Sequence, residues 1–396
     1  MGNRNTATFQ SLKDLPIPLH QSPCVPHKHE ILICGGAHKR ACYSYHTIKN
    51  EYKFICEYPS DVYLYGHCVV KLIDNKNKNS DQITLLSFGS DWIGEDRHTL
   101  MMKYVSVWKN DNNDYEMNIA NNCNQWIPFI DNDNHPIIIG RDKDKYWGAR
   151  AVIGGSNNHL LFITYSYGNI SVFDLNTFQF IKHDNFPTDN NIYYHCFVQG
   201  QEIIKTNEEK NKQNHQMLLF DRKIGLSIEY DEDNNTFQFH KLSVCSDITS
   251  FNGYGYGYVC INDVILFFGG CHSSTCSKSV YMYSIQEDKW TKFKKTLPSP
   301  LYNCVAILSE EENYIHIIGG QHNSYSEVST HTKTKVRVWY ASQLVIICLF
   351  ICLTQINFFP KDKIKFIIQY WIRTLNIKLG WIDNFDQIIF KYSGMR

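Results

Sequence analysis

The residues best suited to metal or redox chemistry are the 17 histidines and 14 cysteines of this 396-residue chain. Cys271, His272 and Cys276 could begin a metal site, but four residues separate the two cysteines and no second pair matches them. We therefore favour an ordinary loop there. The chain has no phosphate-binding glycine loop, no His-Glu-x-x-His motif and no Ser-His-Asp signature. The sequence predicts no catalytic residue, no metal site and no cofactor.

Gly2 is a candidate for lipidation, because Met1-Gly2 followed by Thr6 matches the N-myristoylation pattern. A frayed, unmodified terminus is the alternative interpretation. One acyl chain holds a membrane only marginally, and Arg4 and Lys13 are the basic residues close enough to help. The N-terminus lacks the apolar core of a secretory signal, so we expect a cytoplasmic protein with reduced cysteines. Membrane association is the alternative localisation.

Charge and composition exclude some functions. The chain has 39 basic and 39 acidic residues, and this balance argues against a nucleic-acid-binding surface. Its hydrophobic content of 43% is sufficient for a core, which excludes wholesale disorder. The 25 tyrosines and 23 phenylalanines favour β-structure.

Gly-Gly doublets reveal an internal repeat. Three of them directly follow the apolar runs 31–34, 265–268 and 315–318; these doublets are Gly35-Gly36, Gly269-Gly270 and Gly319-Gly320. A fourth doublet, at Gly154, precedes its β-run and is not a repeat marker. Glycine is expected where a strand ends in a sharp turn with positive φ.

A fixed order of elements follows each repeat marker: a loop, a β-rich run, a polar turn and an aromatic residue. After Gly270 the run is 279–284 and the aromatic residue is Trp290; after Gly36 the run is 43–45, followed by Phe54. Three copies lack the doublet. Their β-rich runs are 105–108, 170–174 and 226–230, and their aromatic residues are Trp126, Phe180 and Phe239.

Cysteines provide a second periodic marker. Cys24, Cys68, Cys196 and Cys304 each lie six to nine residues after a proline, and Cys260 fits the same apolar strand without the proline. We interpret them as small buried residues on a crowded inner strand. His67 and His195 precede two of these cysteines at equivalent positions, which favours packing or hydrogen bonding over catalysis.

These markers resemble the kelch repeat, the four-stranded blade of a β-propeller. The resemblance covers residues 7–339 and implies an all-β fold of six blades, whose marker positions fall near 36, 90, 165, 221, 270 and 320. We expect a propeller over residues 1–340, a hydrophobic segment over 341–360 and an amphipathic, helical extension over 361–396.

The sixth blade lacks an outer strand after its predicted strand Val336–Trp339. Residues 7–13, followed by Leu15-Pro-Ile-Pro18, parallel residues 289–293 and the Leu297-Pro-Ser-Pro300 that comes after them. The N-terminal strand is therefore predicted to complete the last blade and close the ring, which removes two exposed edges.

The C-terminal region is harder to interpret. Of the 20 residues from Tyr340 to Phe359, 15 are apolar when tyrosine and cysteine are counted, and residues 344–359 form a candidate membrane span. A segment packed on the propeller and an artefactual insert are the alternatives. Beyond Pro360, apolar residues recur at helical spacing.

The family resemblance implies a non-enzymatic scaffold that presents loops on one face to a protein partner. Its loops carry basic and imidazole side chains that would suit an acidic peptide; these are Lys39, Arg40, Arg97, His98, Arg222, Lys223, His272 and His322. The alternative interpretation is that these side chains are solvated at the rim and contact no partner. Some kelch-type propellers are copper sugar oxidases, iron-dependent plant specifier proteins or sialic-acid mutarotases, but we could not match the oxidase constellation of Tyr, His and a Tyr–Cys link. A third possibility is a scaffold tethered to a membrane.

Overall fold

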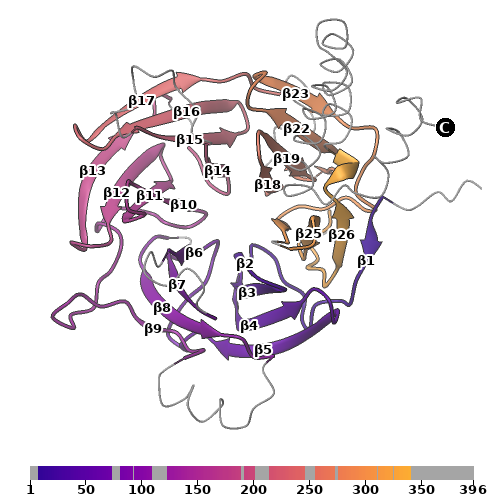
Figure 1. Ribbon diagram of the computed structural model, residues 1–396, viewed down its shortest axis with the longest axis horizontal. Coiled ribbons are helices and arrows are strands. Elements are labelled where there is room, and N and C mark those ends of the chain that lie inside the picture. Colours follow the sequence, from indigo (N-terminus) through magenta and orange to yellow (C-terminus); the bar gives the residue numbers. More distant parts are fainter. Residues whose placement is uncertain are drawn as a thin grey trace, which may run out of the picture.

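The computed structural model describes residues 8–73, 81–91, 93–108, 123–188, 191–200, 214–245, 255–272, 275–309, 311–323 and 325–339. Within them, six four-stranded antiparallel sheets surround a central axis as blades (Figure 1). This arrangement confirms the all-β, six-bladed propeller. Gly2 and residues 341–396, including the apolar run 344–359, lie outside the described residues. None of the helices formed by the described residues is long and apolar enough to cross a membrane.

Each blade runs from an inner strand at the axis to an outer strand at the rim. Blade 1 contains β2 (Cys24–His27), β3 (Glu30–Gly36), β4 (Lys39–His46) and β5 (Glu51–Glu57). Blade 2 contains β6 (Cys68–Leu72), β7 (Gln82–Gly89), β8 (His98–Val105) and β9 (Ile127–Pro128). Blade 3 contains β10 (Arg150–Gly154), β11 (Leu160–Tyr165), β12 (Asn169–Asp174) and β13 (Gln179–Asn185).

The other three blades repeat this order. Blade 4 contains β14 (Cys196–Gln199), β15 (Asn214–Asp221), β16 (Ile224–Asp231) and β17 (Thr236–Lys241). Blade 5 contains β18 (Gly257–Ile261), β19 (Val264–Phe268), β22 (Val280–Ser284) and β23 (Lys289–Lys292), with a small hairpin, β20 (Cys271–His272) and β21 (Thr275–Cys276), between β19 and β22. Blade 6 contains β24 (Val305–Leu308), β25 (Tyr314–Ile318), β26 (His331–Lys335) and the N-terminal β1 (Gln10–Ser11).

The N-terminal strand closes the ring, as the sequence predicts. Gln10 pairs with Lys333, Ser11 pairs with Thr332, and the Leu12 N–H donates to the His331 carbonyl at 2.9 Å. The predicted partner strand Val336–Trp339 is wrong, because the pairing strand is β26 and residues 337–339 form a helical turn. The alternation Val-Arg-Val-Trp has the period of a strand, which explains the wrong prediction. The short strand β1 pairs instead with β26, which directly precedes this segment.

Trp339 has a different role from the one its predicted strand implied. Its side chain is fully buried, and its ring centroid lies 5.6 Å from that of Phe9, 5.8 Å from that of Phe268 and 5.1 Å from that of Phe293. It therefore packs blade 5, blade 6 and the N-terminal segment together, and its burial stabilises the closure by removing apolar surface from water.

A hairpin contact between the third and fourth strands recurs around the ring. The hydroxyls of Tyr45, Tyr230 and Tyr283 donate to the side-chain oxygen of the residue five positions later. Those acceptors, Asn50, Asn235 and Asp288, all have positive φ, a conformation that asparagine and aspartate tolerate in turns. The contact fixes the hairpin that sets the outer strand in register.

The aromatic residue that packs toward the preceding blade lies two positions after this acceptor. It is Trp290 in blade 5, but Tyr52 in blade 1 and Phe237 in blade 4, opposite Tyr45 and Tyr230. The predicted Phe54 and Phe239 are therefore off by two, and Phe54 is 55% exposed. Side chains two apart on a strand share a face, so spacing alone did not distinguish them.

In blade 2, the predicted position of the third strand is also wrong. Its third strand is β8, so only Val105 of the predicted run 105–108 belongs to the strand. Trp126 directly precedes β9, stacks on Tyr58 with 4.6 Å between ring centroids, and donates its indole N–H to the Cys42 sulfur at 3.4 Å. It therefore wedges blade 2 against blade 1.

The predicted hydrogen-bonding role of two inner histidines is confirmed. Nε2 of His67 lies 2.9 Å from the Cys34 carbonyl oxygen of blade 1, and Nε2 of His195 lies 2.6 Å from Thr164 Oγ1 of blade 3. Both histidines are buried, and burial lowers the pKa of His67 to about 4. These histidines link neighbouring blades as neutral side chains at pH 7.

Candidate functional site

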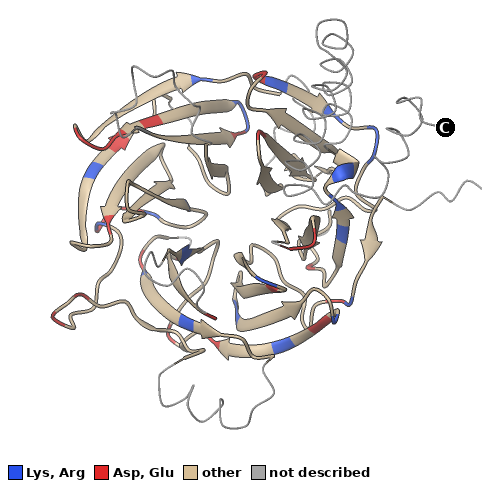
Figure 2. Cartoon of the chain, in the orientation of Figure 1, with Lys and Arg blue, Asp and Glu red and all other residues tan. Residues whose placement is uncertain are grey.

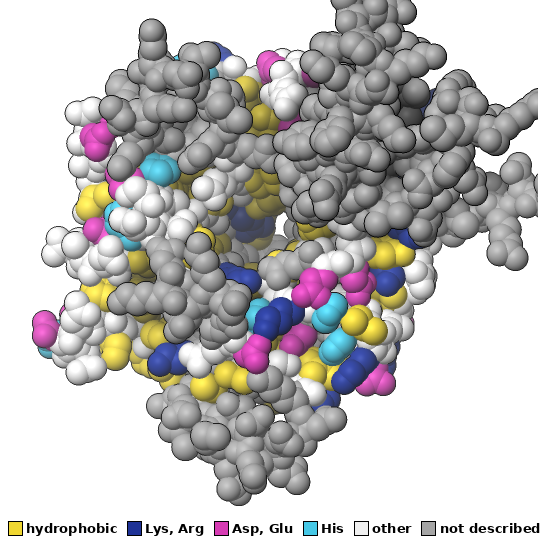
Figure 3. All heavy atoms as spheres, viewed as in Figure 1, with side chains coloured by type: hydrophobic (Ala, Val, Ile, Leu, Met, Phe, Trp, Pro, Cys, Tyr) yellow, Lys and Arg dark blue, Asp and Glu magenta, His cyan; other side chains and the backbone are white. Residues whose placement is uncertain are grey.

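The first residues of the inner strands meet at the axis and enclose a cavity of about 230 Å³. Residues of five inner strands, together with Tyr194 just before β14, form its wall. Every inner strand begins on the face to which the second strand of its blade returns. Figure 3 shows the corresponding hollow at the centre of the molecule, with basic side-chain atoms inside it. The channel therefore opens on the face that carries the predicted loops.

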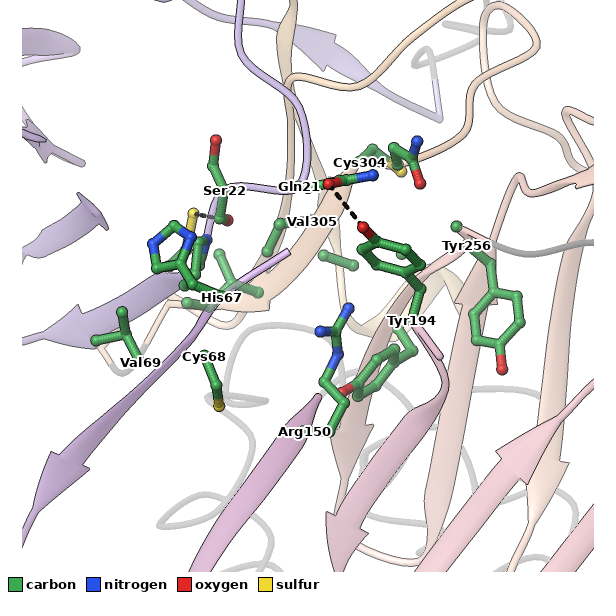
Figure 4. A pocket seen from close by; sticks show the side chains of 18 of the residues that line it. Gln21, Ser22, His67, Cys68, Val69, Arg150, Tyr194, Tyr256, Cys304 and Val305 are labelled. Carbon is green, nitrogen blue, oxygen red and sulfur yellow. Dashed lines mark hydrogen bonds between the residues drawn. The ribbon is translucent and has the colours of Figure 1, made fainter. Parts of the chain in front are cut away.

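Among the described residues, Arg150 is the one lysine, arginine, aspartate or glutamate that lines the cavity. It begins β10, the position that Cys24, Cys68 and Cys196 occupy in β2, β6 and β14. Its side chain points into the space beside Tyr194 (Figure 4). A long cationic side chain at a position otherwise filled by a small one places a positive charge close to the axis.

The guanidinium of Arg150 has no carboxylate partner among the described residues. It donates through Nη1 to the Ala149 carbonyl at 2.9 Å and makes a cation–π contact with Tyr194, at 5.7 Å from the ring centroid. Arg150 has five N–H donors and needs several acceptors to be satisfied. The remaining donors are available to water or to an anionic ligand.

The charge of Arg150 acts on groups in several blades. Burial raises the pKa of Cys68 to about 11 and that of Tyr258 to about 12, and in both cases Arg150 opposes the shift by favouring the anion. Burial lowers the pKa of His195, and Arg150 adds to that effect by repelling the imidazolium. The channel is thus an electropositive, partly desolvated space, in which a negative charge is stabilised.

Neutral polar groups from other blades complete the wall. The Tyr194 hydroxyl donates to Oε1 of Gln21 at 3.0 Å, as the dashed line in Figure 4 marks. Asn303 donates through Nδ2 to Gln321 at 2.9 Å, while its buried Oδ1 has no hydrogen-bond partner. The site can therefore recognise a charged group through Arg150 and orient it through amide and hydroxyl groups.

Comparisons with known proteins agree with this architecture. The kelch motif family matches residues 253–295, which span blade 5. The chain is a kelch-repeat β-propeller. The solved structure of YjhT is similar to it, with a TM-score of 0.52 and 13% identity over 81% of this chain and 95% of that chain. At this identity the likeness concerns the fold alone. No curated protein matches the sequence significantly.

In this kelch propeller, the glycine doublets end the second strands and cannot accept a side chain. A Cβ on Gly269 would lie 2.1 Å from the Leu301 carbonyl oxygen, and one on Gly319 would lie 2.3 Å from that of Leu19. Both glycines have positive φ, as do Gly35, Gly270 and Gly320, whereas Gly36 does not. At Gly269 and Gly319, the end of the second strand therefore contacts the segment that leads into the next blade.

The predicted arginines of the loop face mostly have local partners. Arg40 Nη2 lies 3.6 Å from Glu57, and Arg97 Nη2 lies 3.2 Å from Asp142. Arg222 donates to the Tyr193 hydroxyl at 2.6 Å and lies over its ring. Figure 2 shows basic and acidic residues interspersed around the ring. The rim is therefore largely neutralised, in contrast to the channel.

The three predicted histidines of the loop face differ in accessibility. His98 begins β8 and is only 5% exposed, with Nε2 3.1 Å from Ser87 Oγ, so it packs inside blade 2 and is unsuited to contact a partner. His322 is half-buried, with Nδ1 2.8 Å from the Pro300 carbonyl, and His272 is exposed. His272 and His322 stay candidates for a loop-face contact.

Sequence reasoning missed Arg150. The signal was its place in the repeat, because it stands where three other inner strands begin with cysteine. Among the described residues, the one group that could hold a metal is Asp131, Asp133 and His135. It lies in a surface turn after β9, where Asp131 already accepts the backbone N–H groups of Asp133 and His135.

Proposed function

We propose that this kelch propeller is a non-enzymatic binding scaffold that takes an acidic segment of a protein partner on its loop face. One carboxylate of that segment enters the channel and pairs with Arg150. The observation that carries the proposal is the contrast between Arg150, which has no carboxylate partner among the described residues, and the rim arginines that have theirs.

The chemistry of the channel supports a carboxylate ligand. Arginine presents a planar fork that matches the two oxygens of a carboxylate, and the low dielectric of a narrow channel strengthens that pair. The neighbouring Gln21 and Asn303 can bind the peptide backbone, and the exposed His272 lies on the same face. The partner is thus defined by its chemistry, a glutamate- or aspartate-containing peptide.

A binding titration tests the proposal. The full chain is titrated into fluorescein-labelled peptides of equal length, one rich in glutamate and one with glutamine in its place. We expect Arg150→Gln to weaken binding of the acidic peptide about ten- to a hundredfold, because hydrogen bonds to charged groups contribute about 1.5–3 kcal/mol. Lys223→Gln is the matched control, since it removes an exposed charge from the loop face.

Equal binding of the two peptides, or unchanged binding by Arg150→Gln, would contradict the proposal. The alternative is a kelch-type propeller enzyme, and metal analysis of the purified protein separates the two. Stoichiometric copper or iron would favour the enzyme.

A further inference from the structure

A hairpin on the loop face of blade 5 brings two cysteines together, apart from the inner-strand cysteines that the repeat explains. In the pairing of β20 with β21, Cys271 lies directly opposite Cys276. Their sulfur atoms are 3.3 Å apart, and the Cys276 thiol donates to the Cys271 sulfur. Both residues are free cysteines, and neither has the packing role of an inner strand.

The backbone of this hairpin suits a disulfide. The Ser277 N–H donates to the Gly270 carbonyl at 2.8 Å, so the next pair along, Cys271 and Cys276, is a non-hydrogen-bonded pair. In agreement, the Cys276 N–H donates instead to Asn323 Oδ1 at 2.7 Å. Such pairs bring their Cα atoms to about 4.5 Å, inside the disulfide range of about 4.4–6.8 Å. Rotation of the side chains is sufficient to bond the sulfurs.

The two cysteines are buried, but the residues next to them in the hairpin are exposed. Cys271 and Cys276 are each 6% exposed and pack on Tyr302, while the neighbouring His272 and Thr275 are exposed. Burial, together with the contact to Cys271, raises the pKa of Cys276 to about 12. The Cys276 thiol therefore stays protonated at neutral pH, and we assign the first attack to Cys271, whose sulfur accepts the hydrogen bond from Cys276.

We propose that Cys271 and Cys276 form a redox-active dithiol that is oxidised to a disulfide by low-molecular-weight disulfides such as oxidised glutathione. Cys271 loses its proton to solvent, and its sulfur attacks the glutathione disulfide, which forms a mixed disulfide and releases one glutathione thiolate. Cys276 then loses its proton and attacks the Cys271 sulfur, which displaces the second glutathione. Two protein thiols are oxidised and one glutathione disulfide is reduced to two thiols.

The test places the full chain in buffers of graded reduced and oxidised glutathione, followed by alkylation of free thiols and peptide mass spectrometry. We expect the segment containing Cys271 and Cys276 to lose two hydrogen atoms and both alkylation sites together. Cys276→Ser should trap the mixed disulfide with glutathione on Cys271, because the resolving thiol is absent. Cys271→Ser should leave Cys276 largely unmodified.

Cys34 and Cys42 are the internal control, since they also lie opposite one another in neighbouring strands but are fully buried. They should remain reduced and react with the alkylating reagent only after the protein is unfolded. Independent glutathione adducts on Cys271 and Cys276 in the wild type, or a pair that stays reduced wherever Cys34 and Cys42 do, would overturn the proposal. The wild-type measurement is decisive even if a variant fails to fold.

Discussion

Two seams between blades are built from the same repeat position with opposite chemistry. Between blades 4 and 5, Trp290 packs on Phe220 and Phe267, with ring centroids 5.3 and 5.0 Å away. Between blades 6 and 1, the equivalent Tyr52 places its hydroxyl 2.5 Å from Nδ1 of His331. The seam between blades 4 and 5 is aromatic, whereas the seam between blade 1 and the blade that the N-terminal strand completes is hydrogen-bonded.

The polar seam extends further into blade 6. Nδ1 of His316 lies 2.8 Å from Nε2 of His331, and the ring of Tyr45 packs against both histidines. Burial lowers the pKa of His316 to about 3 and holds that of His331 well below its ordinary value, and Lys333 lowers both further. The difference teaches that the seam beside the closing blade uses directional hydrogen bonds, which set the position of that blade at the cost of sensitivity to acid.

The largest single-residue effect should come from the aromatic seam. Trp290→Ala removes contacts with Phe220, Phe267 and Tyr283 and a hydrogen bond to the Ser243 carbonyl, and should lower the free energy of unfolding by about 3 kcal/mol. Urea denaturation measures it. Because the tryptophan side chain carries no titratable group, the difference from wild type should be equal at pH 7.5 and pH 5.5. A loss below about 1 kcal/mol would remove the distinction between the seams.

The polar seam should respond to acid. The histidine pKa is lowered in the folded state from about 6.5 in the unfolded chain, so the stabilisation is present above pH 6.5 and is lost as the pH falls toward 3. Well below pH 6.5, each histidine lowers the free energy of unfolding by about 1.4 kcal/mol per pH unit. Between pH 6.5 and 5.5, the wild type should therefore lose about 2 kcal/mol more than His316→Gln/His331→Gln, because each histidine is half protonated in the unfolded chain at pH 6.5 and contributes about 1 kcal/mol over this interval.

The buried His67, His98 and His195 also have lowered pKa values, but both proteins share them and their contribution cancels. Denaturation curves across the pH range provide the measurement. Parallel pH dependences of the wild type and the double variant would show that these two histidines do not carry the effect.

A smaller effect sharpens the assignment of the aromatic position in blade 1. Tyr52→Phe leaves Nδ1 of the buried His331 without its partner and should cost about 1–2 kcal/mol at pH 7. Phe54→Ala, two residues along the same strand at a 55% exposed side chain, should cost about 0.5 kcal/mol or less. Thermal and urea denaturation of both variants decide the order, and the reverse order would restore Phe54 to the repeat position.

Local patterns made much of the fold predictable. Gly269-Gly270 and Gly319-Gly320 marked strand ends because no other residue fits their backbone, and residues 7–13 were recognisable as the missing strand because their sequence parallels residues 289–293. The hairpin contact was also readable, since Tyr45, Tyr230 and Tyr283 each precede Asn or Asp by five residues. It would have placed Tyr52 and Phe237 correctly.

By itself, the sequence determined the repeat, the number of blades and the way the ring closes, because these depend on short-range periodicity and backbone constraints. Only the tertiary structure decided which cations have partners, which histidines are buried at a seam and which two cysteines face each other. Arg150 and His331 acquire their properties from residues far away in the chain, and Cys276 acquires its from a hairpin pairing that the spacing of the cysteines did not reveal. Electrostatic and hydrogen-bonding energies depend on distance in space and on burial.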